Sequence, residues 1–314
     1  MNEITMTRHN QLIDPTLQVW GWEIPVYLFI GGMVAGMMVL SGYFLLRGRD
    51  RDLACVCYRI PSIGLAMISL GMLALFLDLE HKAYVWRLYT TFEIKSPMSW
   101  GSWILLLVYP ALIASFLMHV PVPIRHRLPL LQKWSNKLRS TPNAPVKIGK
   151  LNIAVGILLG TYTGVLLSSL SARALWNSAI LGLLFLASGL STAAALVHMI
   201  ARDRWERETL ARADNMFLTA EMLIIALFMI NMLGSSEAQI RAAMLLLTGP
   251  YAASFWVFVV LLGILVPLFI QTRAVKHKII HTPVAPLLVI LGGLILRFIL
   301  VSAGQSSNYV FHAF

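Results

Sequence analysis

The chain has 314 residues, of which 58% are hydrophobic and only 12% are charged, and its mean hydropathy is +0.74. This composition excludes a soluble globular protein and leaves no room for a large soluble domain. The net charge of +11 does not indicate a nucleic-acid partner, because such partners bind surfaces that combine basic and aromatic residues in one module, and the sequence contains no such module.

Eight long apolar stretches account for most of the sequence. Each is long enough to cross a hydrocarbon core of about 30 Å as a helix. We therefore predict an all-α, polytopic membrane protein in which residues 1–314 form a single membrane domain. The predicted spans are residues 23–46, 58–78, 100–120, 149–170, 176–200, 214–234, 251–271 and 282–304.

Lysine and arginine are distributed unevenly between the two sides of these spans. Eight crossings place both termini on one side, which carries six of these residues, whereas the other side carries 18. Because short connections rich in lysine and arginine stay in the cytoplasm, we predict that both termini face outward from a bacterial or archaeal cytoplasmic membrane. The residues predicted to face outward are Arg8, Lys82, Arg87, Lys95, Arg173 and Arg241.

The residues that most often bind metals or haem are poorly placed to do so. Cys55 and Cys57 lie in a connection predicted to be cytoplasmic, so we expect plain thiols there rather than a disulfide. Two cysteines are also too few for an iron–sulfur cluster. None of the eight histidines lies in the middle of a predicted span, and we expect His119 and His198 at the lipid headgroups. We therefore expect no metal, haem or iron–sulfur cluster in this chain, so that any redox chemistry uses a diffusible or partner-borne cofactor.

Ionisable side chains inside a bilayer are costly and are therefore candidates for function. Glu221 is expected in the cytoplasmic half of its span, and Arg297 in the outer half of the last span. Either they tie helices together, by pairing with each other or with backbone carbonyls, or they belong to a proton relay. The candidates near the outer side are Glu23, Asp78, Glu80 and His81.

Small and aromatic residues predict how the helices pack. Glycines recur at four-residue spacing over residues 156–164, which allows neighbouring backbones to approach closely. Tyr162 points to a different face of the same helix, where its hydroxyl can hydrogen-bond a carbonyl group. Trp20 and Trp22, before the first span, are expected in the interfacial aromatic belt.

Several segments match one known family in the same order along the chain. The first is WGWEIPVYLFIGGMVAG (Trp20–Gly36) and the last is LRFILVSAGQ (Leu296–Gln305). Between them lie LDLEHKAYVWRLY and SPMSWG (within Leu77–Gly101), LLGTYTGVLLSSL (Leu158–Leu170), SGLSTAAAL (Ser188–Leu196) and the acidic Glu221. With these segments the whole chain resembles the NrfD/PsrC family, the membrane subunits of polysulfide reductase-like complexes.

This resemblance implies an architecture and a function. It implies eight helices in two four-helix bundles, with a quinone, either menaquinone or ubiquinone, bound near the outer face. Electrons are exchanged with an extracytoplasmic ferredoxin-like subunit that carries 4Fe–4S clusters and connects to a molybdopterin catalytic subunit or a multihaem cytochrome c. The chain is therefore expected to be the membrane anchor and quinone-binding subunit of a respiratory oxidoreductase complex, embedded in membrane lipid.

The family also implies residues for the quinone site. In polysulfide reductase-like members, an asparagine and a histidine on the first helix and a tyrosine on the fourth contact the quinone. Tyr162 matches the tyrosine, whereas Ile24 stands at the asparagine position and Tyr27 lies near the histidine position. We therefore predict a quinone site that includes Tyr27, Tyr162, His81 and Glu23.

Proton transfer requires further residues, because iron–sulfur clusters accept electrons and not protons. Asp78 or Glu23 is placed to take protons from a quinol near the outer side. Glu221 and Arg297 are the candidates if protons also move to or from the cytoplasm.

The alternative function is a secondary transporter, or a proton-translocating membrane subunit without quinone chemistry. Transporters of this kind usually contain inverted repeats and helices broken near the midplane. In this sequence the prolines lie mainly towards the ends of the predicted spans, and no convincing repeat is visible, although the connection 121–148 divides the spans four and four.

Overall fold

The structure is a computed structural model that describes residues 20–49, 55–79, 81–120, 129–276 and 282–307. Within these ranges eight helices are long and apolar enough to cross a membrane. The prediction of an all-α protein with eight spans is therefore confirmed. The spans are α1 (Glu23–Leu46), α2 (Ile60–Asp78), α4 (Pro97–Met118), α7 (Ala144–Ser168), α8 (Ile180–Ile200), α9 (Arg204–Leu233), the continuous segment Ser254–Val275 and α12 (Val284–Ser306).

Two of these helices begin well before the predicted spans. Helix α7 begins at Ala144 rather than at residue 149, with a proline in its first turn, where the missing N–H costs no hydrogen bond. Helix α9 begins at Arg204 rather than at residue 214. Hydropathy marks only the part of a helix that lies in hydrocarbon, whereas arginine and glutamate favour helix and extend α9 beyond it.

Three shorter helices lie in the connections and were not predicted. They are α3 (Arg87–Thr90), α6 (Pro129–Ser140) and α10 (Glu237–Leu247). Helix α10 is stabilised at its start by a reciprocal pair of hydrogen bonds between Ser236 and Gln239, a capping box that satisfies otherwise free N–H groups.

The segment Ser254–Val275 is not a uniform α-helix. Its first part, Ser254–Leu265, is wound as a π-helix, and it continues as α11 (Val266–Val275). Gly263 of the π-helix faces Gly292 of α12 so closely that a methyl group on either would overlap the other backbone. Glycine at both positions therefore permits this backbone contact.

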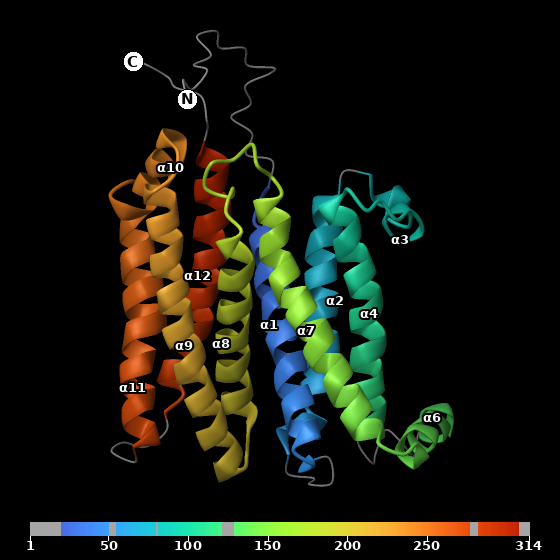
Figure 1. Cartoon of the computed structure of the whole chain (residues 1–314). Helices are drawn as coiled ribbons and strands as arrows, with labels where there is room; N and C mark the ends of the chain where they lie inside the picture. The colour runs from blue at the N-terminus through green and yellow to red at the C-terminus, as the bar shows by residue number, and fades with distance from the viewer. Residues whose placement is uncertain (1–19, 50–54, 80, 121–128, 277–281, 308–314) are drawn as a thin grey trace.

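Helix α1 lies at the centre of the molecule (Figure 1) and packs against α2, α7, α8 and α12. Helix α4 packs against α2 and α7, and α8 packs against α9 and α12. Glycines again permit the closest contacts, because Gly36 of α1 lies against the Gly189 carbonyl of α8 and Gly156 of α7 lies against the Ala35 carbonyl of α1. The close packing predicted for the glycines of 156–164 is thus confirmed.

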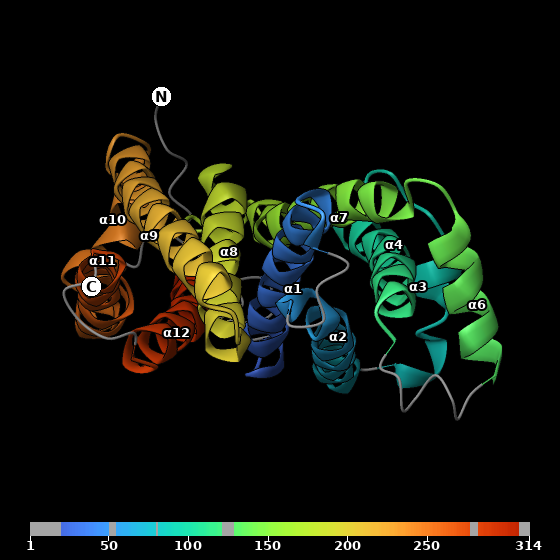
Figure 2. The same cartoon turned by 90° about the horizontal axis from the view of Figure 1, so that it is seen from below.

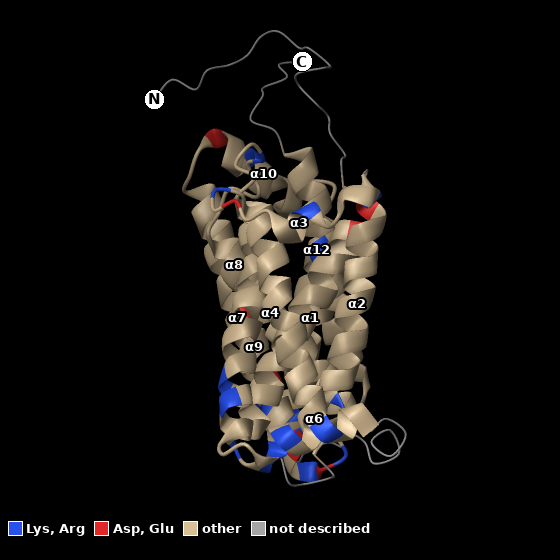
Figure 3. Cartoon of the chain, turned by 90° about the vertical axis from the view of Figure 1, so that its right-hand side faces the viewer, with Lys and Arg blue, Asp and Glu red and all other residues tan. Residues whose placement is uncertain are grey.

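Lysine and arginine gather at one end of the helices, where α1 ends and α9 begins (Figure 3). We call this end, with Arg47, Lys137, Lys147, Arg204 and Arg273, the basic end. The opposite end contains the first residues of α1, the last residues of α2 and the connection between α2 and α4.

The two cysteines differ from the prediction. Cys55 and Cys57 are joined by a disulfide, so the expectation of plain thiols is wrong. The 3₁₀ turn Val56–Tyr58 brings their Cα atoms to 5.2 Å, within the range that a disulfide requires. The prediction considered the redox compartment and not this local turn.

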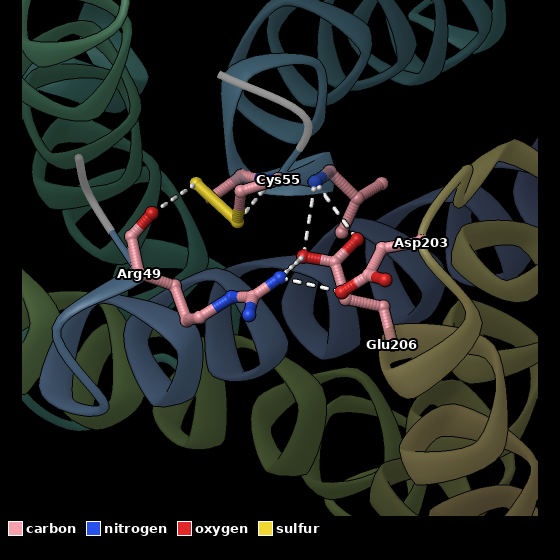
Figure 4. Close-up of polar contacts among 6 residues, drawn as sticks. Arg49, Cys55, Asp203 and Glu206 are labelled. Carbon is pink, nitrogen blue, oxygen red and sulfur yellow. Dashed lines mark hydrogen bonds and ion pairs between the residues drawn. A yellow bond between two sulfur atoms is a disulfide. The ribbon is translucent and has the colours of Figure 1, made fainter. Parts of the chain in front are cut away.

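The same turn is fastened to the start of α9 (Figure 4). The buried carboxylate of Glu206 accepts a hydrogen bond of 3.1 Å from the Val56 N–H and pairs with Arg49 at 3.6 Å. Arg49 also forms a 2.6 Å ion pair with Asp203. These contacts connect the segment after α1 to a helix distant in sequence at the basic end.

The histidines predicted at the lipid headgroups are buried instead. His119 is 1% exposed and His198 is 7% exposed. His119 lies 2.9 Å from the Ser115 carbonyl through Nδ1 and packs edge-on against Tyr58. Each lies at the end of an apolar helix, but neighbouring segments cover it, which the position along the sequence alone does not reveal. Glu80 and His9, His126, His277, His281 and His312 lie outside the described residues.

Candidate functional site

A cavity of about 120 Å³ lies between α1, α2, α4 and α7 at the end opposite to the basic end. Its walls are mostly apolar, and the polar side chains that line it are those of Tyr27, Asp78, Tyr89, Ser102 and Tyr162. An apolar cavity of about 150 Å³ is large enough to take up benzene, so this cavity matches a single ring in size. The arrangement suits a flat, largely apolar group that carries hydrogen-bonding oxygens.

Tyr162 reaches this cavity from α7, and its hydroxyl lies against Gly101 of α4. A methyl group at Gly101 would overlap that hydroxyl. The tyrosine is 5% exposed, and it points away from the glycines of 156–164 that contact α1 and α8, as predicted. Gly101, which ends the SPMSWG segment, thus has a specific purpose that the sequence did not reveal, because it makes room for a side chain from another helix.

Tyr27 and Tyr89 bring two further hydroxyl groups to the cavity. Tyr27 comes from α1 and is 3% exposed. Tyr89 belongs to α3, outside the spanning helices, and its pKa is raised by partial burial and secondarily by Tyr109. A raised pKa keeps the phenol protonated, so that Tyr89 remains a hydrogen-bond donor at neutral pH. Sequence reasoning predicted Tyr27 but missed Tyr89, because only the folding of the connection brings α3 over the cavity.

Side chains of α4 hold this connection in place. The hydroxyl of Ser102 donates a hydrogen bond of 2.6 Å to the Leu88 carbonyl. Ser99 accepts a bond of 3.1 Å from the Glu93 N–H, and the Trp100 indole N–H donates to the Ile94 carbonyl at 2.8 Å. The serines and tryptophan of SPMSWG therefore fix the cover of the cavity.

The two predicted proton acceptors take different positions. Asp78 is the last residue of α2 and lines the cavity. Glu23 is the first residue of α1 and does not line it, but its charge acts on Asp78. The structure thus brings Asp78 together with Tyr27 and Tyr162, and places Glu23 beside Asp78 as a second carboxylate.

His81 is not in the cavity with the tyrosines. It lines a neighbouring hollow of about 440 Å³ together with Tyr84 and Arg87. The two hollows share wall residues, among them Leu79 and Leu88. His81 therefore lies beyond the shared wall, and the structure does not bring it together with Tyr27 and Tyr162 in one cavity.

Trp20 forms part of the cavity wall, which differs from its predicted place in the interfacial belt. It stacks on Trp176 with ring centroids 5.1 Å apart, and its backbone exchanges two 3.0 Å hydrogen bonds with the side chain of Gln305. Trp22, in contrast, is 56% exposed. The end of α12 thus positions one wall of a cavity formed mainly by other helices.

A second buried polar cluster lies among α8, α9, α11 and α12. Arg297 is fully buried and donates to the Ser188 hydroxyl and, at 3.1 Å, to the Phe185 carbonyl. Although Glu221 and Arg297 are both among the described residues, no direct ion pair joins them; their charges act on each other, and both side chains face Ser188. The predicted contact of Arg297 with a backbone carbonyl is therefore observed, whereas direct pairing with Glu221 is not.

Asp214 belongs to this cluster and was missed in the sequence. It is 1% exposed, and it accepts hydrogen bonds of 2.9 Å from Ser191 and 2.7 Å from Gln271. The sequence contains a signal for it, because Asp214 lies two helical turns before Glu221 and therefore on the same face of α9. It was overlooked because the predicted span began at this residue, which made it look like a boundary residue.

Comparison with known proteins identifies the family. The family model described as "Polysulphide reductase, NrfD" matches residues 6–307. This chain belongs to that NrfD family. The protein NrfD of Escherichia coli K12 is 30% identical over 311 residues, which cover 91% of this chain and 95% of NrfD. A membrane-family relative from Wolinella succinogenes, one of the chains of its polysulfide reductase, is 28% identical over 311 residues, which cover 92% of this chain and 95% of the relative.

The family assignment confirms the resemblance seen in the sequence. A member of this NrfD family with eight apolar helices is a multi-pass membrane protein, consistent with the anchor of a respiratory oxidoreductase. The Wolinella succinogenes relative is named as one chain of a polysulfide reductase, which implies a complex with other subunits for that protein.

Proposed function

We propose that this chain is the membrane anchor and quinone-binding subunit of a respiratory oxidoreductase complex. In this proposal it exchanges electrons between the quinone pool, menaquinone or ubiquinone, and an extracytoplasmic ferredoxin-like subunit with 4Fe–4S clusters. That subunit connects to a molybdopterin catalytic subunit or a multihaem cytochrome c. The observation that carries the proposal is the ring-sized cavity with tyrosine hydroxyls and one carboxylate, at the end opposite to the basic end.

The residues of the cavity fit a quinone head group. The apolar walls exclude water from a ring, and the hydroxyls of Tyr27, Tyr89 and Tyr162 are available to donate hydrogen bonds to its oxygens. A bound quinol supplies two electrons and two protons. Asp78 holds a carboxylate at the cavity wall to take a proton, and Glu23 beside it offers a second acceptor. His81 stands at the neighbouring hollow, where it can pass protons toward water.

The proposal includes an orientation and an arrangement in two groups. Because lysine and arginine concentrate at the basic end, we assign that end to the cytoplasm and both termini to the outside. The helices α1, α2, α4 and α7 then form one four-helix bundle with the cavity near the outer face. The helices α8, α9 and α12 and the segment Ser254–Val275 form the other. The connection between α2 and α4 covers the cavity from outside, where the ferredoxin-like partner docks.

Proton transfer through the second bundle is part of the proposal. Arg297, Ser188 and Glu221 lie in one buried polar cluster with Ser191, Asp214 and Gln271. This line of polar groups supports proton movement between the membrane interior and the basic end. It is also the observation that favours the second candidate function, a proton-translocating subunit without quinone chemistry.

Substitution of Tyr162 by phenylalanine tests the quinone site. In the intact complex we expect the KM for quinol to rise by up to about tenfold, because one hydrogen bond contributes about 0.5–1.5 kcal/mol. Tyr251→Phe is the matched control, since Tyr251 bonds Ser306 at 3.4 Å and does not line the cavity. Unchanged turnover and KM in Tyr162→Phe would remove Tyr162 from the site.

A further inference from the structure

Helix α6 has one apolar and one polar face, although it is too short to cross a membrane. In a helix of 3.6 residues per turn, Leu130, Leu131, Trp134 and Leu138 share one face. Leu130 is 73% exposed and Trp134 is 58% exposed. Two large apolar side chains are thus left without cover by the rest of the described chain.

The helix lies across the direction of the spanning helices. Figure 2, seen from below, shows α6 lengthwise at the outer edge of the molecule, whereas the spanning helices are seen nearly end-on. Figure 1 places α6 at the basic end, and it packs against α4. Since the spanning helices stand along the membrane normal, α6 lies parallel to the membrane surface at the level where the helices leave the hydrocarbon.

Specific contacts hold α6 at this position. The guanidinium of Arg139 donates two hydrogen bonds, of 3.1 and 2.6 Å, to the Met118 carbonyl at the end of α4. Leu138 packs against the buried cluster of Leu45, Met118, Ala144 and Ile148. Because Leu138 faces the protein, Leu130 and Trp134 on the outer part of the same face point beyond it.

The charges beside these apolar residues are positive. Lys133 and Lys137 are exposed and lie next to the Leu130 and Trp134 side of the helix, and the Lys137 ammonium lies 5.7 Å from the centre of the Trp134 ring. The helix contains no acidic residue. An apolar edge flanked by lysines is the pattern by which interfacial helices bind anionic lipid.

We propose that α6 is an interfacial helix that binds anionic phospholipid in the leaflet at the basic end. Leu130 and Trp134 enter the boundary between headgroups and acyl chains. Lys133 and Lys137 contact the phosphate groups. The occupant is lipid because α6 lies in the plane of the interface beside α4, where the spanning helices require acyl chains. This inference depends on the membrane topology and not on the quinone site.

Quenching by brominated lipid tests this assignment directly. The full-length chain is reconstituted into vesicles of equal parts phosphatidylcholine and phosphatidylglycerol, with bromine on the acyl chains of one lipid or the other. The fluorescence that is lost in Trp134→Phe isolates the contribution of Trp134. We expect stronger quenching when phosphatidylglycerol carries the bromine, with a local enrichment of about fivefold for each lysine engaged, the factor that corresponds to about 1 kcal/mol.

Paired variants separate this site from the general charge of the basic end. Lys133→Gln with Lys137→Gln should bring the preference for phosphatidylglycerol close to one. Arg202→Gln with Arg204→Gln removes the same charge from exposed positions elsewhere at that end and should leave the preference unchanged. Equal loss in both pairs would overturn the proposal.

Two further results would also overturn it. The absence of Trp134 quenching by either brominated lipid would mean that water or a partner protein covers the helix. Equal quenching by both lipids would mean that α6 enters the interface without selecting an anionic headgroup.

Discussion

The two buried polar regions of this NrfD-family protein differ in whether they leave space for another molecule. Between α1, α2, α4 and α7, tyrosine hydroxyls and Asp78 surround a hollow. Among α8, α9, α11 and α12, Arg297 and Asp214 are instead satisfied by neighbouring protein groups. Polar groups around a hollow can recognise a ligand, whereas polar groups bonded to one another hold helices together or pass protons.

The largest expected effect is on stability and concerns the filled region. Arg297→Met removes the donor to Ser188 and the Phe185 carbonyl and leaves Glu221 without a compensating charge. We expect a loss of about 3–5 kcal/mol in the free energy of unfolding, as when one partner of a buried charge pair is removed. Thermal or denaturant unfolding of the purified chain in detergent measures it.

A second substitution tests the reason for that loss. Glu221→Gln in the Arg297→Met background removes the uncompensated charge and should recover part of the stability. If the double variant is no more stable than Arg297→Met, the two charges are not coupled and the filled region is described wrongly.

The next effect concerns the hollow region. Gly101→Ala places a methyl group against the Tyr162 hydroxyl, and overpacking of this kind costs about 1–3 kcal/mol. We expect quinol affinity of the complex to fall about tenfold with little change in folding, measured by steady-state quinol oxidation. Gly64→Ala is the control, because its methyl group meets only a movable leucine side chain; equal effects of both variants would refute a specific function for Gly101.

Asp214→Asn separates proton transfer from electron transfer. Asparagine has nearly the same shape and can keep one of the bonds to Ser191 and Gln271, so we expect stability to change by about 1 kcal/mol or less. Quinol oxidation should continue, while proton uptake at the basic end, followed with a pH-sensitive dye in vesicles, slows. Unchanged proton uptake would leave Asp214 as a residue that only ties helices together.

The smallest effect concerns the cover of the cavity. Ser102→Ala removes the hydrogen bond to the Leu88 carbonyl, which is worth about 1 kcal/mol. We expect faster hydrogen exchange in residues 84–92 and a small rise in KM for quinol. Ser69→Ala, which removes a bond within α2 only, should leave exchange in that connection unchanged, and equal exchange in both variants would contradict the proposed function of Ser102.

The sequence predicted the spanning helices because hydropathy reports directly on burial in hydrocarbon. It also predicted Tyr27, Asp78 and Tyr162, since helical geometry and family motifs place them at the same end. It could not predict Tyr89, because that contact depends on how an irregular connection folds over the helix ends. Gly101 was missed for a similar reason, since its importance lies in a side chain on a different helix.

Asp214 and the cysteines show two further limits. Asp214 was assigned to a helix boundary because α9 extends beyond its apolar part, and a charged residue at that point looks solvated. The disulfide between Cys55 and Cys57 depends on a local turn that hydropathy and redox compartment do not encode.

Photoaffinity labelling of the intact complex with an azidoquinone tests the central claim most directly. The account predicts labelled peptides from the walls of the cavity, in α1, the end of α2, α3, the start of α4 and the end of α7, with competition by unlabelled quinone. Labelling confined to α8, α9, α11 and α12, or labelling that unlabelled quinone does not reduce, would contradict it.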